Sequence, residues 1–135
     1  MIYNLWAELY EGLKTKLSQS QYNVSIHRIA PQKKSFPIVI FSEITNQTSE
    51  TATRGLEGVD TVGFEADIYI APKNSTEAKI FAQDSEISQI VDDYMLSVGF
   101  TRMSSTVAPN VDSTIFRRVM RYEANASTRT GKIYR

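Results

Sequence analysis

The sequence predicts an α+β fold, a mainly antiparallel β-sheet with two helices packed on one face, in the order α-β-β-β-α-β-β. Two segments carry apolar residues at three- and four-residue steps, which is typical of amphipathic helices. Five others alternate apolar and polar residues or form short apolar runs, which is typical of strands. Short connections between consecutive strands favour antiparallel pairing. The 135 residues indicate one domain, expected at residues 1–124, with a basic C-terminal tail at residues 125–135.

An apolar stripe at helical spacing opens the chain and predicts the first helix; it consists of Ile2, Leu5, Trp6, Leu9, Leu13 and Leu17. Residues 22–27 alternate and predict a strand, and residues 36–41 predict a second. Pro37 is tolerated near a strand start, where its missing N–H breaks no ladder. Residues 43–60 are polar and lose the pattern, so we expect a long projecting loop or hairpin arm that orders on assembly, of the kind that is usually functional.

Residues 62–70 alternate most clearly and predict the central strand. A second helix follows, with Asn74 or Ser75 as its N-cap and Glu77 in its first turn. We expect Gly99 to end this helix in a left-handed conformation.

Residues 100–107 have weak strand character, and residues 115–124 predict the last strand. The apolar stripes of all these elements must be covered, so we expect one shared core. Its expected members are Trp6, Leu9, Leu13, Phe64, Ala66, Ile68, Val91 and Tyr94.

The composition excludes several classes of protein. Hydrophobic residues make up 41% of the chain and charged residues 22%, which excludes disorder and collagen-like repetition. The sequence has no cysteine, which excludes disulfides, thiolate zinc sites and cysteine nucleophiles. No apolar run approaches about 20 residues, and the N-terminus lacks the features of a signal peptide. We therefore expect a protein of the reducing cytosol that has no membrane partner.

No catalytic constellation emerges, so we expect no enzyme, no cofactor and no metal. His27 is the only histidine, and it lacks a nucleophile within reach in the sequence pattern. Glu65 and Asp67 share one strand face but lack a third ligand for a metal. The acidic residues of the second helix are expected on its solvated face: Glu77, Asp84, Glu86, Asp92 and Asp93.

The net charge of zero hides a polarity along the chain. Residues 1–99 hold 8 Lys and Arg against 13 Asp and Glu, a net charge of −5, whereas residues 100–135 hold 7 against 2, a net charge of +5. This asymmetry fits a nucleic-acid-binding tail or a head-to-tail contact between identical subunits. The overall neutrality favours the contact between subunits.

Arginines on both faces of the last strand favour a protein contact as well. Alternation places Arg118 and Tyr122 on the core side, where Arg118 snorkels or pairs with a carboxylate, and Arg117 and Arg121 on the other side. Arginine and tyrosine are enriched in interfaces. The alternative to a protein contact is a β-strand that binds nucleic acid, with bases stacked on Tyr122 beside the arginines.

The ordered set of elements supports a resemblance to a known family. It comprises the opening helix, Phe36-Pro37-Ile38-Val39-Ile40, the glycine-bearing polar loop, Gly63-Phe64-Glu65-Ala66-Asp67-Ile68-Tyr69-Ile70, Met95-Leu96-Ser97-Val98-Gly99-Phe100, the Pro109 turn and Ile115-Phe116-Arg117-Arg118-Val119-Met120-Arg121-Tyr122. This set resembles the tail terminator (tail completion) and related head–tail joining proteins of long-tailed bacteriophages and phage-like particles.

The resemblance implies a tail-terminator-like fold and a virion structural protein, assembled in the cytoplasm of the host bacterium. Family members form a ring, usually a hexamer, that caps the tail tube, stops its polymerisation and joins it to the head connector. The implied partners are further copies of the chain, the tail tube protein and the connector or neck proteins, with the sheath as a further candidate. Neither a membrane nor a specific nucleic acid is expected.

Three alternatives remain open: a neck adaptor or minor tail protein at another level of the particle, a small nucleic-acid-binding module that uses the C-terminal arginines, and, last, a small hydrolase. For the ring, the candidate subunit-interface residues come from the polar loop and the basic C-terminal region. They are Arg54, Leu56, Glu57, Val59, Arg117, Arg121, Arg129 and Tyr134.

Overall fold

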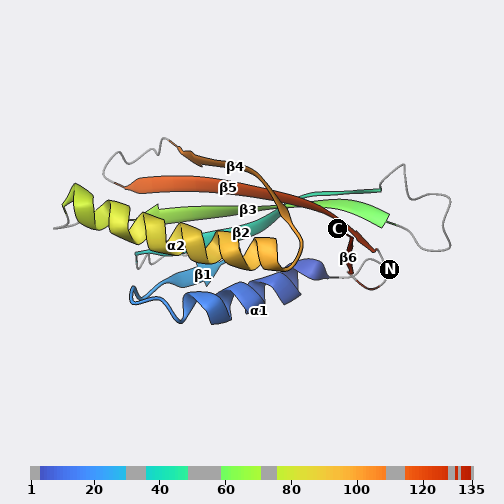
Figure 1. Cartoon of the computed structure of the whole chain (residues 1–135), viewed down its shortest axis with the longest axis horizontal. Coiled ribbons are helices and arrows are strands. Elements are labelled where there is room, and N and C mark those ends of the chain that lie inside the picture. The colour runs from blue at the N-terminus through green and yellow to red at the C-terminus, as the bar shows by residue number, and fades with distance from the viewer. Residues whose placement is uncertain are drawn as a thin grey trace.

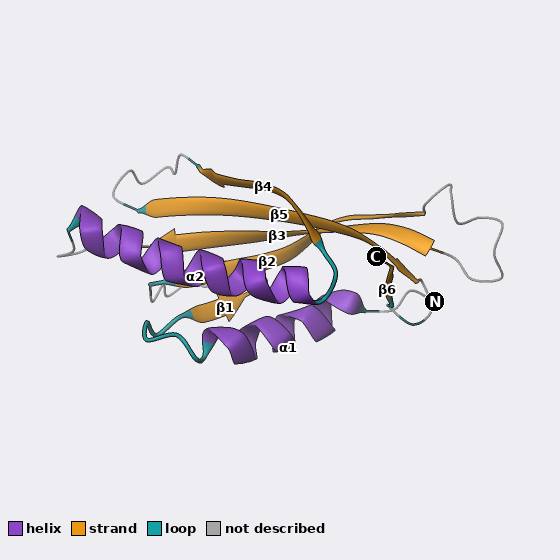
Figure 2. Cartoon of the chain, viewed as in Figure 1, coloured by secondary structure: helices purple, strands orange, loops and turns teal. Residues whose placement is uncertain are grey.

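The computed structural model describes residues 4–29, 36–48, 59–70, 76–108, 115–127, 130 and 132–134. The elements are α1 (Leu5–Leu17), β1 (Ser25–His27), β2 (Ile38–Thr48), β3 (Val59–Ile70), α2 (Glu77–Ser97), β4 (Thr101–Val107), β5 (Phe116–Ser127) and β6 (Ile133–Tyr134). The strands form one sheet in the order β1-β2-β3-β5-β4, and the short strand β6 also pairs with β5. Both helices lie side by side on one face of this sheet (Figure 1, Figure 2). The predicted α+β class and the order α-β-β-β-α-β-β are confirmed.

The sheet is mixed, which corrects the expectation that consecutive strands pair antiparallel. β1 runs parallel to β2, with Ile26 opposite Val39, whereas every other pair is antiparallel. A parallel pair requires the chain to return to the end of the sheet from which it left. β1 and β2 are separated by ten residues of sequence, a longer connection than a hairpin turn uses.

Helix α1 buries one stripe of four leucines, Leu5, Leu9, Leu13 and Leu17. Asn4 caps its first turn by accepting a hydrogen bond from the Ala7 N–H at 3.3 Å. Gly12 lies where the helix meets α2: a Cβ atom at this position would overlap the hydroxyl of Tyr94. The glycine therefore allows the Tyr94 ring to pack directly against the backbone of α1.

Helix α2 begins one or two residues later than the sequence predicts. Its N-cap is Thr76, not Asn74 or Ser75, because the extended Thr76 backbone turns its side chain to accept from the Lys79 N–H. At the other end, Gly99 has a φ of 106°, as expected. The Gly99 and Phe100 N–H groups donate to the Leu96 and Met95 carbonyls, which completes a Schellman motif.

Part of the predicted polar loop is strand. β2 continues through Thr48 and β3 starts at Val59, so both ends of residues 43–60 extend a long antiparallel pair. A register shift between Glu43 and Thr45 interrupts this pair. Residues 43–47 are exposed or half-buried, so no alternation of apolar and polar residues marks this part of the strand in the sequence. Residues 49–58 lie outside the described part.

The C-terminal region also extends the sheet. β5 runs on to Ser127, past the predicted boundary at residue 124, and β6 pairs Ile133 with Ala126 and Tyr134 with Asn125. The described part of residues 125–135 is thus attached to β5 by strand pairing, in contrast to the expected tail.

The core lies between the helices and the sheet. Six of the eight residues predicted for the core belong to it, and the other two, Trp6 and Tyr94, are half-buried and pack against it. Phe64 lies at its centre, 5.4 Å from the Phe41 ring and 5.5 Å from the Phe100 ring. Met95, not Tyr94, is the fully buried residue near the end of α2.

Candidate assembly surface

The face of the sheet away from the helices carries two ion pairs between β3 and β5. Because Glu65 lies opposite Arg121 in the register, the Arg121 Nε reaches the Glu65 carboxylate at 2.9 Å. Arg117 lies opposite Tyr69, and its Nη2 is 3.3 Å from the Asp67 Oδ2. The Arg117 guanidinium also lies 5.6 Å from the centre of the Tyr69 ring. The two arginines expected at an interface thus have partners within the chain.

Asp67 is the most buried charge of this face, with a side chain 12% exposed. Burial raises the pKa of its carboxyl group; the neighbouring Glu65 raises it further, and the Arg117 guanidinium opposes both. Asp67 Oδ1 and Arg117 Nε are buried and have no hydrogen-bond partner among the described residues. This pair is therefore only partly satisfied.

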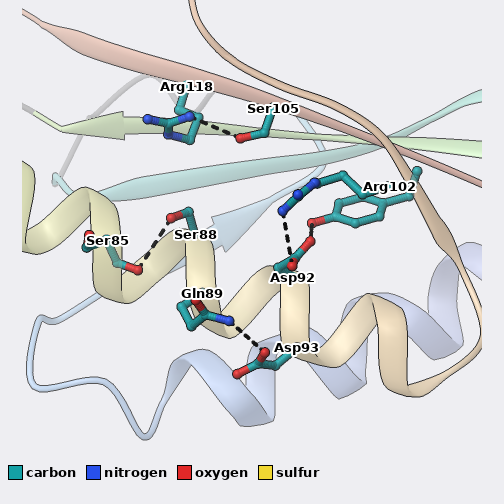
Figure 3. A network of polar contacts seen from close by, with 9 residues as sticks. Ser85, Ser88, Gln89, Asp92, Asp93, Arg102, Ser105 and Arg118 are labelled. Atoms are coloured by element: carbon teal, nitrogen blue, oxygen red, sulfur yellow. Dashed lines mark hydrogen bonds and ion pairs between the residues drawn. The ribbon is translucent and has the colours of Figure 1, made fainter.

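On the other face of β5, Arg118 forms a two-pronged ion pair with helix α2. Its Nε and Nη2 lie 2.7 and 2.9 Å from the two oxygens of Asp84. Its Nη1 donates to Ser105 of β4 at 3.0 Å, the contact that Figure 3 shows. Asp84 is buried, so its expected place on the solvated face of the helix was wrong. The expectation that Arg118 lies on the core side and pairs with a carboxylate is confirmed.

A second polar link joins the helix to the sheet through Asp92. The buried Tyr122 hydroxyl donates to Asp92 at 2.8 Å, and the Arg102 guanidinium lies 3.2 Å from the other carboxylate oxygen. Burial and the bond to Asp92 raise the pKa of Tyr122. Glu86 accepts from Ser20 at 2.6 Å, so it also contacts the rest of the chain. Of the five acidic residues predicted to be solvated, three therefore form contacts with other elements.

The sheet ends at β4 with an edge that no other described strand covers. Met103 and Val107 of this strand are each 58% exposed. A register shift between Arg102 and Ser104 leaves residues 104–107 as a regular strand. A cleft of about 480 Å³ lies beside Thr101 and Met103. Unpaired edge strands of this kind are templates for pairing with another chain.

The opposite side of the sheet has a second free stretch. β1 pairs only with residues 38–40 of β2, and the Trp6 indole N–H donates to the Phe41 carbonyl at 2.9 Å. Beyond these contacts, no described strand pairs with the outer edge of residues 42–48. Beside it lies a cleft of about 450 Å³, lined by Asn4, Trp6, Arg28, Ser42 and Glu43.

The remaining candidate interface residues are placed only in part. Arg54, Leu56, Glu57 and Arg129 lie outside the described residues. Val59 is the half-buried first residue of β3, opposite Ser127, and Tyr134 pairs with Asn125 through β6. In the register, Val59 and Tyr134 lie toward the end of β5 at Ser127, away from Arg117 and Arg121. Sequence reasoning missed the two open edges, because an edge is a property of strand order and not of local pattern.

The described residues hold no cluster of three or more histidine, aspartate and glutamate side chains that could bind a metal ion. None of the helices in that part of the chain combines the length and the apolar character that crossing a bilayer requires. No known family model matches the chain, and no curated protein is significantly similar to it.

Proposed function

We propose that this chain is a structural subunit that assembles with copies of itself into a ring, in the manner of the tail terminators of long-tailed bacteriophages. In this role the ring caps the tail tube, stops its growth and joins it to the head connector, and the protein resides in the tail or neck of the particle after assembly in the bacterial cytoplasm. It performs no catalysis and requires no cofactor.

The observation that carries this proposal is the pair of unlike open edges at the two sides of one sheet. A head-to-tail ring needs two different, complementary surfaces on each subunit. The free stretch of β2 lies in the part of the chain with net charge −5, and β4 lies in the part with net charge +5. The two edges are therefore different surfaces of one subunit, as a head-to-tail contact requires.

A nucleic-acid-binding module is the weaker candidate. The arginines that would contact phosphate, Arg102, Arg117, Arg118 and Arg121, each form an ion pair with a carboxylate of the same chain. Binding to phosphates would have to replace these pairs, which reduces its gain.

Mass measurement in solution tests the proposal. Native mass spectrometry and light scattering at micromolar concentration should give a closed oligomer, and negative-stain images should show a ring with a central opening. A monomer at all concentrations, with and without purified tail tubes, would refute the ring. Binding to duplex DNA that weakens steeply with salt would favour the module instead. Immunolabelling at the head–tail joint would separate a terminator from a minor tail protein.

A further inference from the structure

We propose that the ring contact is strand pairing: the edge of β4 in one subunit adds to the free stretch of β2, residues 42–48, in the next. This inference rests on the proposed ring and names its interface and its partner, a second copy of the chain. It would continue the sheet from subunit to subunit around the ring.

The backbone of β4 presents free groups to such a partner. The Ala108 N–H donates to the Arg117 carbonyl at 2.9 Å, which fixes the alternation of the ladder with β5. In an antiparallel ladder every second residue points its N–H and C=O away from the neighbouring strand. The backbone groups of Ser105 and Val107 therefore point outward, within the regular part of the edge.

The free stretch of β2 offers a matching edge. The Phe41 carbonyl points away from β3 and accepts a hydrogen bond from the Trp6 indole N–H. The outward backbone groups of β2 that a partner strand could bind therefore lie beyond Phe41. Beyond the register shift at Glu43, residues 45–48 form regular strand, as residues 104–107 do in β4. The cleft bordered by Trp6 and Arg28 leaves the outer side of β2 open where β1 ends.

Strand direction agrees with this pairing. From β2 through β3 and β5 to β4, each neighbour reverses direction, so β4 runs opposite to β2 within one subunit. Rotation about a ring axis along the strands preserves direction, and β4 of one copy would then meet β2 of the next as an antiparallel pair. Charge does not decide this pairing, because Arg102, the only charged residue of β4, forms an ion pair with Asp92 of its own chain.

Cysteine cross-linking tests the pairing directly, because the natural chain has no cysteine. Directly opposed residues share a face, and Thr106, Thr45 and Gln47 all lie on the helix-free face by their register. Thr106→Cys is mixed with Thr45→Cys or with Gln47→Cys and oxidised with copper phenanthroline. At least one mixture should give disulfide-linked dimers at about ten times the yield of a control mixture with Ala82→Cys, an exposed site on α2.

Each outcome decides a different question. Wild-type rings without a mixed cross-link above the control would refute the edge pairing and leave the ring proposal standing. Dimers from Thr106→Cys alone, at the yield of the mixtures or more, would show β4-to-β4 pairing across a twofold axis and would also overturn the inference. A monomeric wild-type chain in the mass measurement would refute the ring itself.

A matched pair of proline variants gives an independent test. Val107→Pro removes an N–H that points outward, so the thermal midpoint should stay within about 3 °C while the oligomer dissociates about tenfold more readily. Thr106→Pro removes an N–H that the alternation assigns to the ladder with β5, and it should lower the midpoint instead. A stable Val107→Pro chain that assembles like the wild type would contradict the inference.

Discussion

Replacing Asp84 with alanine should lower the free energy of unfolding by about 3 kcal/mol. The substitution leaves Arg118 without the carboxylate to which its Nε and Nη2 donate. Breaking a buried ion pair by removing one partner typically costs about 3–5 kcal/mol. The Arg118 side chain is 21% exposed and keeps its bond to Ser105, so water and the hydroxyl compensate part of the lost interaction. The expected cost is therefore at the lower end of the range.

Urea unfolding of the isolated chain measures this cost, with circular dichroism and the fluorescence of Trp6 as two probes. Trp6 is the only tryptophan, and its hydrogen bond to Phe41 makes its emission sensitive to loss of the fold. Gln89→Ala, an exposed change on the same helix, serves as the control and should alter stability by less than about 0.5 kcal/mol. The double variant Asp84→Leu with Arg118→Met removes both charges and should be within about 1 kcal/mol of the wild type, or more stable.

A loss below about 1 kcal/mol in Asp84→Ala would show that the carboxylate lies in water, as the sequence alone suggested. If the double variant is as unstable as the single variant, the cost comes from packing around residue 84 and not from the uncompensated charge. Either result would refute the reasoning.

Three further changes follow from the structure. Leu9→Ala should cost about 2–5 kcal/mol in the same urea assay, because Leu9 is buried between α1 and the sheet; a cost below 0.5 kcal/mol would place it at the surface. Tyr122→Phe should cost about 1–2 kcal/mol by removing the bond to Asp92, and an unchanged midpoint would contradict that bond. Burial raises the pKa of Asp67, so its contribution to stability is fully present below the unfolded pKa of 3.8 and is lost as pH rises through the folded pKa. The wild type should accordingly lose stability relative to Asp67→Asn on raising the pH across that window, and a constant difference would refute the shift.

Local periodicity was sufficient to predict both helices and the central strand. The leucine stripe of α1 and the alternation of β3 are set by burial on one face, which a sequence shows directly. The end of α2 could also be predicted from the sequence, because glycine tolerates the left-handed conformation that Gly99 adopts there.

The position of Asp84 shows how a signal can be present and still be misread. It lies four residues after Ile80 and three before Ile87, in the same stripe as Val91, so its spacing assigns it to the buried face. Its charge suggested the opposite. The fold places Arg118 of β5 against Asp84 of α2, and this ion pair offsets the cost of burying the carboxylate.

The open edges could not be predicted for a different reason. Strand order depends on which strands become neighbours, as the parallel pairing of β1 with β2 illustrates, and no local pattern encodes that choice. The strand at residues 44–48 has a polar sequence, so it is defined by its backbone pairing with β3 and not by burial.

The close approach of Gly12 to Tyr94 constrains how this sequence can diverge. Any residue other than glycine at position 12 would place its first side-chain carbon where the tyrosine hydroxyl lies. A lineage that acquires alanine there gains helix propensity in α1, but it must shorten or redirect the side chain at position 94 to keep the two helices at the same separation. Among descendants of a common ancestor, these two positions should covary, with glycine retained wherever tyrosine is retained.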